Sequence, residues 1–450
     1  MAAFDIQAFI DRQPIRRPHV VVAALAVLAM FIDGFDIFMI GKIAPAIAQS
    51  FKASPSELTL IFVLQQAGLA VGSFVVSPLS DLYGRKRLLV ISFIIFGLLT
   101  IAGAFAQSIV QLAVLRGLAG LFLAGVVPAV LALVSEITPR KHRSTAVGLA
   151  QAGYSAGNAM GASVAFLVPV YGWQSAFWVG GILALLLAPV LAICLHESLA
   201  FLVTRRRNDP RIAQTLLRIE PGLPLDGREE FTLPTASKSR MGTLMQVFSD
   251  GRAVPTVTTW LCYMLSMGNI ALLASWLPTY FQTMADVSIQ QFAVALIVAL
   301  IGGLAGIGSV GFLMDRLRPF WLVAGYYLGN ATALILIGHT AFDSPAFMPL
   351  LVAFAFFQSG GQGGLNVLLT QFYPPSVRST GLGWAGGMGR LGGVAAPAIG
   401  GLALTYSLSL EATLTAIAMS PLLVMLLLLL ILRPTHAAAE RRAAERTAAQ

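Results

Sequence analysis

Two acidic side chains interrupt the first long apolar segment of the sequence. Asp33 and Asp36 lie within the run from Val20 to Ile40, and a helix needs about 20 such residues to cross a bilayer. A charged Asp at the bilayer centre costs about 2.5–3.5 kcal/mol, so both side chains must face a polar interior. Their spacing places them on one face of a helix. We predict that they take up and release protons; the alternative is that they only neutralise cations on neighbouring helices.

Two arginines lie in other apolar segments of the chain. Arg116 and Arg390 stay protonated, so each needs a counter-charge or an anionic ligand. Asp33 and Asp36 are the internal candidates, and a ligand carboxylate is the other. Because glycines lie on both sides of Arg390 and leave space around its guanidinium, we predict that Arg390, more than Arg116, binds a ligand carboxylate. Lys42 is a third cation, to which the sequence assigns no role.

Polar and aromatic side chains recur in pairs four residues apart, a spacing that places both members on one helix face. Amides donate and accept directional hydrogen bonds, and aromatic rings offer stacking surfaces. Together they suit a flat, aromatic, carboxylated ligand, although packing between helices also explains such pairs. The three pairs are Gln362 with Asn366, Trp276 with Tyr280, and Tyr154 with Asn158.

The composition is that of a polytopic membrane protein. Of the 450 residues, 57% are hydrophobic and only 11% are charged, whereas soluble proteins carry about 25% charged residues. The mean hydropathy is +0.80. The two cysteines, Cys194 and Cys262, lie in apolar runs and are expected to be packing residues. We expect no metal and no cofactor.

Twelve apolar segments predict twelve transmembrane helices, because runs of this length and hydropathy span lipid as helices. The predicted spans are 19–48, 58–80, 87–106, 109–133, 144–168, 173–195, 254–283, 289–314, 319–339, 347–371, 380–404 and 410–432. Lys and Arg concentrate in alternate connections and at both ends of the chain. By the positive-inside rule, both termini are cytoplasmic. The net charge of +9 therefore reflects topology and not a nucleic-acid partner.

The sequence repeats itself in two halves. The stretch that starts at Pro139 and reads P-R-K-H-R-S-T resembles the one that starts at Pro374 and reads P-P-S-V-R-S-T. Asp81 and Asp315 are related by nearly the same offset. The pattern predicts an all-α fold of two parallel six-helix repeats, residues 1–195 and 254–432. Between them we expect a linker, 196–253, with short helices on the membrane surface, and after them a basic tail, 433–450.

Charged residues on the predicted cytoplasmic connections form a candidate conformational gate. Such a gate would hold one conformation through ion pairs and release it in another, and its glycine would permit a tight turn. The alternative is that these charges only set the topology or cap helices. The candidates are Asp81, Gly84, Arg85, Glu136 and Arg143 in the first half, and Asp315, Arg316 and Arg378 in the second.

These motifs together resemble the aromatic acid:proton symporter family of the major facilitator superfamily. The matching pieces are Asp33-Gly34-Phe35-Asp36, Arg116, Glu136 to Arg143, Glu197-Ser198, Ser275-Trp276-Leu277-Pro278, Gly361-Gln362-Gly363-Gly364, Phe372-Tyr373-Pro374, Arg378-Ser379-Thr380-Gly381, Gly383-Trp384 and Gly389-Arg390-Leu391-Gly392. Ser77 and Leu82 depart from the superfamily signature around Asp81, where glycine and arginine are usual. His196 stands where proline usually precedes Glu197-Ser198, and Lys42 where these transporters more often have an apolar residue. The resemblance implies proton-coupled import of benzoate-type acids across the bacterial inner membrane, by alternating access and not by enzyme chemistry. We expect a functional monomer.

Other functions remain open on the sequence alone. Another carrier of the superfamily is the first alternative: a proton-driven drug exporter, or a symporter for sugars, polyols or other organic anions. Exporters of cationic drugs need an acidic cavity, so Arg116 and Arg390 argue against that function. An enzyme would need a nucleophile–base set or metal ligands, which the five His residues do not form. A sensor would need a signalling domain, for which the linker is short.

Overall fold

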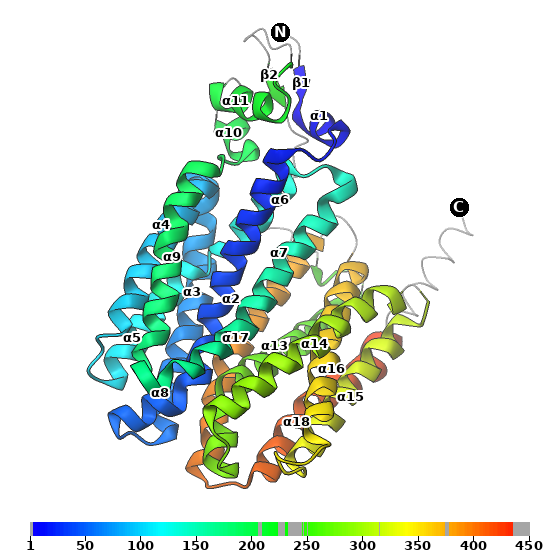
Figure 1. The fold of residues 1–450 in the computed structure, drawn as a ribbon. Coiled ribbons are helices and arrows are strands. Elements are labelled where there is room, and N and C mark those ends of the chain that lie inside the picture. Colours follow the sequence, from blue (N-terminus) through cyan, green and yellow to red (C-terminus); the bar gives the residue numbers. More distant parts are fainter. Residues whose placement is uncertain are drawn as a thin grey trace. The chain divides into compact units, whose positions relative to one another are not determined.

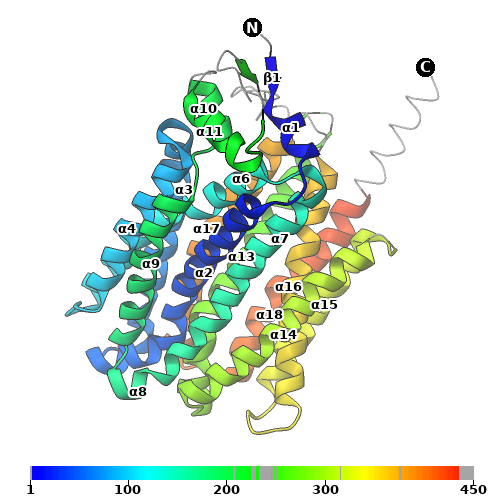
Figure 2. The same cartoon turned by 45° about the horizontal axis from the view of Figure 1, so that its top comes forward.

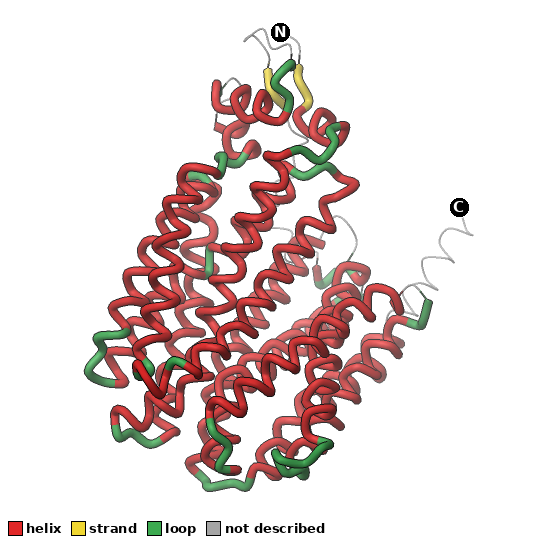
Figure 3. Tube along the Cα trace, in the orientation of Figure 1, coloured by secondary structure: helices red, strands yellow, loops and turns green. Residues whose placement is uncertain are grey.

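Long helices make up nearly all of the protein in the computed structural model (Figure 1, Figure 3). The structure describes residues 3–205, 209–223, 230–232, 245, 247–249, 251–314, 316–373 and 378–434. Asp315, most of the basic tail and parts of the linker, including Leu244, lie outside these ranges.

The helices belong to two compact units. Unit 1 comprises Met1–Ala46 and Leu64–Lys238, and unit 2 comprises Ile47–Val63 and Ser239–Gln450. The helices of the first predicted half are α2 (Arg17–Phe51), α3 (Thr59–Tyr83), α4 (Arg85–Gly103), α5 (Ile109–Leu123), α6 (Val126–Ile137), α7 (Arg140–Met160), α8 (Val168–Tyr171) and α9 (Gln174–Cys194), with the 3-10 turns η1 (Pro55–Leu58) and η2 (Gly161–Phe166). Those of the second are α13 (Ala253–Ala285), α14 (Ile289–Met314), α15 (Pro319–Gly338), α16 (Phe347–Phe372), α17 (Arg378–Thr405) and α18 (Leu410–Leu427), with the π-helical turn η3 (Leu428–Leu432).

Each predicted span corresponds to a helix or a pair of consecutive helices, so the predicted helical membrane fold is confirmed. Within the described residues, nine helical segments are long and apolar enough to cross a membrane by length and composition. The predicted spans 144–168, 347–371 and 380–404 are not among the nine. They correspond to α7 with η2, to α16 and to α17, which are rich in glycine and polar residues.

The same glycine-mediated helix contact occurs in both units, which is the structural counterpart of the sequence repeat. In each unit, two glycines one turn apart face main-chain carbonyl groups of a second helix, and a Cβ at either position would collide with the carbonyl oxygen. Small residues allow such close approach where lipid provides no hydrophobic force between helices. On α3 and α5 the pairs are Gly68 with Gly117 and Gly72 with Leu121; on α14 and α16 they are Gly302 with Val352 and Gly306 with Phe356.

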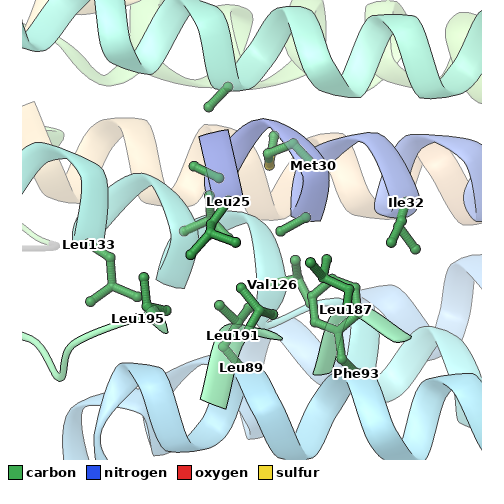
Figure 4. Close-up of a cluster of buried hydrophobic side chains, with 14 of the residues drawn as sticks. Leu25, Met30, Ile32, Leu89, Phe93, Val126, Leu133, Leu187, Leu191 and Leu195 are labelled. Atoms are coloured by element: carbon green, nitrogen blue, oxygen red, sulfur yellow. The ribbon is translucent and has the colours of Figure 1, made fainter. Parts of the chain in front are cut away.

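An apolar core fills unit 1 between α2, α4, α6 and α9 (Figure 4). Leu25 and Met30 of α2, Phe93 of α4, and Leu187 and Leu191 of α9 all belong to this cluster. All five side chains are buried. This core fixes the orientation of α2 and therefore of the two acids that follow on the same helix.

Short elements at the start of the chain and in the linker form a small subdomain in unit 1, which gathers at one end of the unit (Figure 1, Figure 2). Its elements are β1 (Ala3–Asp5), α1 (Ile6–Arg12), α10 (Leu199–Arg205), α11 (Pro210–Ile219) and β2 (Glu230–Thr232). The two strands pair in parallel, with Phe4 opposite Phe231. Ile6, Leu202 and Leu216 are fully buried within its own apolar cluster.

The linker contains the short helices α10 and α11, whereas the N-terminal elements were not predicted from the sequence. Asp209 caps α11 by accepting a hydrogen bond from the Arg211 main-chain N–H at 3.0 Å, and Pro210 occupies the first turn. This follows the usual preference for an acidic N-cap followed by proline. The strand β1 and helix α1 are too short to produce a periodic sequence pattern.

We expect Gly157→Ala to destabilise the protein, because α2 and α7 are in very close contact at this residue. A Cβ there would collide with the carbonyl oxygen of Phe31 and lie 2.8 Å from the main-chain nitrogen of Phe35. Overpacking costs about 1–3 kcal/mol, so the melting temperature in detergent should fall. Gly148→Ala on the same helix is the control, since no atom lies within 4 Å of the position that its added methyl group would take. Equal melting temperatures for the two variants would contradict the expectation.

Candidate functional site

Arg116 and Asp36 form a buried bidentate ion pair in unit 1. The guanidinium Nη1 donates to Asp36 Oδ1 at 3.1 Å, and Nη2 donates to Asp36 Oδ2. The two side chains are 1% and 0% exposed. Nη1 also lies 3.4 Å from the hydroxyl of Thr100, which accepts from it, and the ring of Phe177 lies 5.8 Å from the guanidinium carbon. Arg116 therefore has its counter-charge inside the protein.

Asp33 lies one turn before Asp36 on α2 and is 1% exposed. Between the two acids, Gly34 faces the main-chain carbonyl of Tyr154 on α7, where a Cβ would collide with the oxygen. The aromatic ring of Tyr154 packs edge-on against Phe38, with the ring centroids 5.8 Å apart. Close contact with α7 thus holds the acidic stretch of α2 in place.

Lys42 is also buried on α2, at 6% exposure. Its Nζ donates to the main-chain oxygen of Asn158 and, at 3.0 Å, to the Oδ1 atom of the same residue. A Cβ at position 161 would lie 3.2 Å from Nζ, so Gly161 leaves the space that the ammonium group occupies. Of the predicted pair on α7, Asn158 is therefore engaged by Lys42, and Tyr154 packs against α2.

A chain of hydrogen bonds connects three helices of unit 2. Ser266 Oγ on α13 donates to Gln362 Oε1 at 2.6 Å and lies 2.6 Å from the hydroxyl of Tyr327 on α15. Gln362 Nε2 in turn donates to Asn366 Oδ1 at 3.1 Å. The predicted pair on α16 is thus brought together, and it belongs to a larger polar network than the sequence indicated.

A second amide cluster lies one turn earlier on α16. Gln358 Oε1 accepts from Asn330 Nδ2 at 2.6 Å and from Asn269 Nδ2 at 3.5 Å. This cluster was not predicted from the sequence. Gln358 precedes Gln362 by four residues, so the same spacing rule could have identified it. Asn269 and Asn330 have no such signal, because only the tertiary fold brings α13 and α15 to α16.

Trp276 and Tyr280 stack on each other and connect α13 to α17. Their ring centroids are 6.0 Å apart with an interplanar angle of 13°. The indole N–H of Trp276 donates to the Pro397 carbonyl at 2.8 Å, and the Tyr280 hydroxyl donates to the Gly400 carbonyl at 2.6 Å. Both side chains are fully buried, and both polar atoms contribute to helix packing.

Arg390 differs from Arg116 in its surroundings. It lies half-buried on α17, next to Gly389, which faces the ring of Tyr263. Among the side chains that the structure describes, no carboxylate lies within ion-pair distance of the Arg390 guanidinium. Arg390 is thus a cation in a glycine-rich helix, without a counter-ion among the described side chains.

The predicted gate residues of unit 1 form a network that includes the start of the linker. Arg85 pairs with Glu136 through Nη1 and Oε1, and Glu136 Oε2 accepts from the Ser198 hydroxyl at 2.7 Å. Glu197 Oε1 accepts from the main-chain N–H groups of Lys86 and Ser198, each at 2.9 Å. Three segments that are distant in sequence therefore meet at these charges.

Gly84 permits the turn on which this network depends. Its φ of 102° lies in the region that favours glycine. A Cβ at this position would also lie within 2.8 Å of the Glu197 carboxyl carbon. The turn between α3 and α4 thus needs glycine both for its backbone and for its contact with Glu197.

Arg143 and Glu136 have separate partners in unit 1. Both are predicted gate residues, but they do not pair with each other: Glu136 binds Arg85, whereas Arg143 lies 3.6 Å from Asp11 of the N-terminal subdomain. Asp11 also accepts from the Arg140 main-chain N–H at 2.9 Å, at the start of α7. No sequence pattern indicates that an acid from α1 reaches this position.

The second-half gate candidates are only partly described. Arg316 follows α14 and stacks on Phe312, with its guanidinium carbon 3.9 Å from the ring centroid. Arg378 opens α17, but its side chain, like that of Asp81 at the end of α3, is outside the described part of the structure, as is all of Asp315.

We expect Glu136→Gln to slow transport while substrate affinity changes by no more than a few-fold. The change removes the charge that binds Arg85 but preserves the size of the side chain and one hydrogen-bond acceptor for Ser198. Uptake rate and equilibrium binding should be measured on the same purified protein. Arg218→Gln, which removes an exposed charge from α11, is the control. A loss of binding in a variant of unchanged melting temperature would contradict a gating role.

The repeated helical fold, with buried charges inside membrane-spanning helices, defines a multi-pass membrane carrier. Residues 26–396 match the sequence profile of the Major Facilitator Superfamily. The chain is 32% identical to the gallate transporter of Pseudomonas putida over 419 residues, 93% of each chain. The chain belongs to the major facilitator superfamily and, within it, to the aromatic acid:proton symporter family.

Other relatives and a solved structure agree with this assignment. The chain is 33% identical to the 4-hydroxybenzoate transporter PcaK of Pseudomonas putida, covering 92% of this chain and 93% of the relative. It is 28% identical to the benzoate transport protein of Acinetobacter baylyi, covering 90% and 87%. A crystal structure of a bacterial homolog of the human lysosomal transporter Spinster shares the fold, with a TM-score of 0.66 at 15% identity and coverage of 93% and 96%. The protein is a transporter of the bacterial inner membrane.

Proposed function

We propose that this carrier imports aromatic carboxylic acids of the benzoate type together with protons. The observation that carries the proposal is the contrast between the buried Arg116 and the half-buried Arg390. Asp36 neutralises Arg116, whereas Arg390 has no carboxylate partner among the described side chains. A fixed cation of this kind in a membrane helix is suited to an anionic ligand. The gallate, 4-hydroxybenzoate and benzoate transporters named above support aromatic acids as that ligand.

In this proposal, Arg390 binds the substrate carboxylate and the amides of α16 bind its ring substituents. Gln362 and Asn366 lie on the same face of α16, and Gln362 Nε2 donates a hydrogen bond to Asn366 Oδ1. A guanidinium can hold a carboxylate through two parallel hydrogen bonds. Trp276 and Tyr280 support the site through their stacked rings. Tyr154 and Asn158 remain candidate contacts on α7.

We assign proton coupling to Asp33 and Asp36, with different tasks. Asp36 is held by both terminal nitrogens of Arg116, and its protonation would leave a buried guanidinium without a counter-charge. Asp33, one turn away, is the acid that takes up and releases the proton. The Arg116–Asp36 ion pair keeps the charge beside Asp33 constant while Asp33 gains or loses its proton.

The proposed mechanism is alternating access of the halves 1–195 and 254–432, which the linker 196–253 connects. The gate residues of the cytoplasmic connections stabilise one conformation, and the basic tail 433–450 stays in the cytoplasm. We propose that a single chain in the bilayer is sufficient for transport. The coupled entry of one acid and protons needs no further partner.

Uptake by proteoliposomes tests this function directly. Purified protein should accumulate labelled benzoate-type acids when a proton gradient, acidic outside, is imposed, and an uncoupler should abolish the accumulation. The matching uncharged amides and a cationic drug should not accumulate. Failure to accumulate any acid of the panel, or accumulation that an uncoupler does not change, would refute the proposal.

A further inference from the structure

Gln358 is the central member of an amide cluster that lies entirely within unit 2. Asn330 Nδ2 and Asn269 Nδ2 both donate to Gln358 Oε1, at 2.6 Å and 3.5 Å. The two asparagines are 1% and 6% exposed, so helix packing holds both donors in place. Because both hydrogen bonds end on the oxygen of the Gln358 amide, the cluster fixes the orientation of that amide and leaves its nitrogen as the unengaged end.

The nitrogen of this amide is available to a ligand. Gln358 Nε2 makes no hydrogen bond within the described part of the chain. Gln358 is half-buried, whereas both of its partners are buried. An amide nitrogen carries two N–H donors and does not accept. Gln358 therefore offers hydrogen-bond donors, and only donors, to whatever binds beside it.

Gln358 lies in the same part of unit 2 as Arg390. Each residue is near the middle of its helix, α16 and α17 respectively, and carriers of this kind bind substrate near the bilayer midplane. Tyr263 of α13 interacts with Gln362 and with the charge of Arg390. Gln362 follows Gln358 by one turn on the same face of α16. A ligand carboxylate on Arg390 would thus place its ring beside this face of α16.

We propose that Gln358 is a substrate-binding residue that contacts the ring substituent opposite the carboxylate and selects substituents with an oxygen acceptor. This rests on the proposed function, in which Arg390 binds the carboxylate. A hydroxyl or carbonyl oxygen accepts from Nε2, whereas an amino group brings further donors and a methyl group brings no polar atom. An acid of the latter two kinds would leave the Nε2 donors without a partner once water is displaced, which costs affinity.

The test compares four benzoates that differ only in the substituent at position 4: hydroxy, formyl, amino and methyl. The hydroxy, amino and methyl groups are similar in size, and the formyl group can only accept. The purified wild type should bind the hydroxy and formyl acids about three- to tenfold more tightly than the amino and methyl acids. Gln358→Met, which keeps the side-chain length but removes the amide, should lose this preference and retain its affinity for benzoate.

Asn330→Leu tests whether the cluster orients the amide. It removes the shorter of the two hydrogen bonds to Gln358 Oε1 and keeps Gln358 itself. The amide can then rotate, so the variant should bind the formyl and amino acids about equally while it still binds the hydroxy acid, which can accept or donate. The matched control is Gln282→Met near the end of α13, where the amide oxygen has no partner among the described residues. It should behave as the wild type.

The outcomes separate this inference from the proposed function. If the wild type binds all four acids with equal affinity, or prefers the amino acid to the formyl acid, the inference about Gln358 is wrong and the proposed function stands. A Gln358→Met variant that keeps the wild-type preference would also overturn the inference. If the wild type binds none of the four acids and no benzoate, the proposed function itself is refuted.

Discussion

Replacing Arg390 with lysine is expected to weaken the binding of a benzoate-type acid about tenfold to a hundredfold. A charge-assisted hydrogen bond contributes about 1.5–3 kcal/mol, and lysine lacks the planar fork that holds a carboxylate through two hydrogen bonds. The half-buried Arg390 has no described carboxylate partner, so its fork is available to a ligand. Affinity for the uncharged amide of the same acid should change little. Binding of both ligands to purified protein measures the loss of preference.

Arg116→Lys is the matched comparison, with a different expected result. Arg116 is engaged by Asp36 through both terminal nitrogens. Disruption of a buried pair is strongly destabilising, by about 3–5 kcal/mol when one partner is removed. We therefore expect this variant to lower the melting temperature and to retain its preference for the acid. If instead Arg116→Lys lost the preference at an unchanged melting temperature while Arg390→Lys kept it, the two roles would be reversed.

Asp33→Asn and Asp36→Asn should both abolish uncoupler-sensitive accumulation, but they should differ in stability. Asp36→Asn leaves Arg116 buried without a charged partner, so its melting temperature should fall. Asp33→Asn removes the proposed proton carrier and should still exchange substrate down a concentration gradient. Uptake at pH 6 and pH 8, with and without an uncoupler, measures the coupling.

The double variant Asp36→Leu with Arg116→Leu provides a further check on this assignment. Replacing a buried ion pair by apolar residues is often neutral or stabilising. The double variant should therefore recover the stability that Asp36→Asn loses, while accumulation stays absent. Wild-type, uncoupler-sensitive accumulation in both single variants would show that neither acid carries the coupling.

The spans could be predicted closely because lipid imposes a simple rule on sequence. An apolar run must be helical throughout, and the predicted span 289–314 has the same bounds as α14. The ends of α7 were less accurate: the predicted segment 144–168 corresponds to α7, which begins at Arg140, and to the following 3-10 turn. Because the first residues of α7 are charged, the apolar run from which the span was predicted begins one turn after the helix does.

Pairing between side chains could not be predicted to the same degree. The sequence offered two acids for Arg116, and only the relative rotation of α2 and α5 selects Asp36. It placed Arg85, Glu136 and Arg143 together among the gate candidates, and only the fold pairs Glu136 with Arg85. Such choices depend on helix packing that leaves no local signal. Gln358 itself could have been identified from its spacing to Gln362, but its partners Asn269 and Asn330 could not.

The pairing of β1 with β2 sets an order on biosynthesis. The first strand, Ala3–Asp5, leaves the ribosome well before its partner, Glu230–Thr232, which is synthesised only after all the helices from α2 to α9. At about 5–20 residues per second, the N-terminal segment waits tens of seconds for the strand and the α10–α11 helices that cover it. The subdomain can therefore close only after the helices of the first half of the carrier have been synthesised. Deletion of the strand Ala3–Asp5 would remove that late-forming contact.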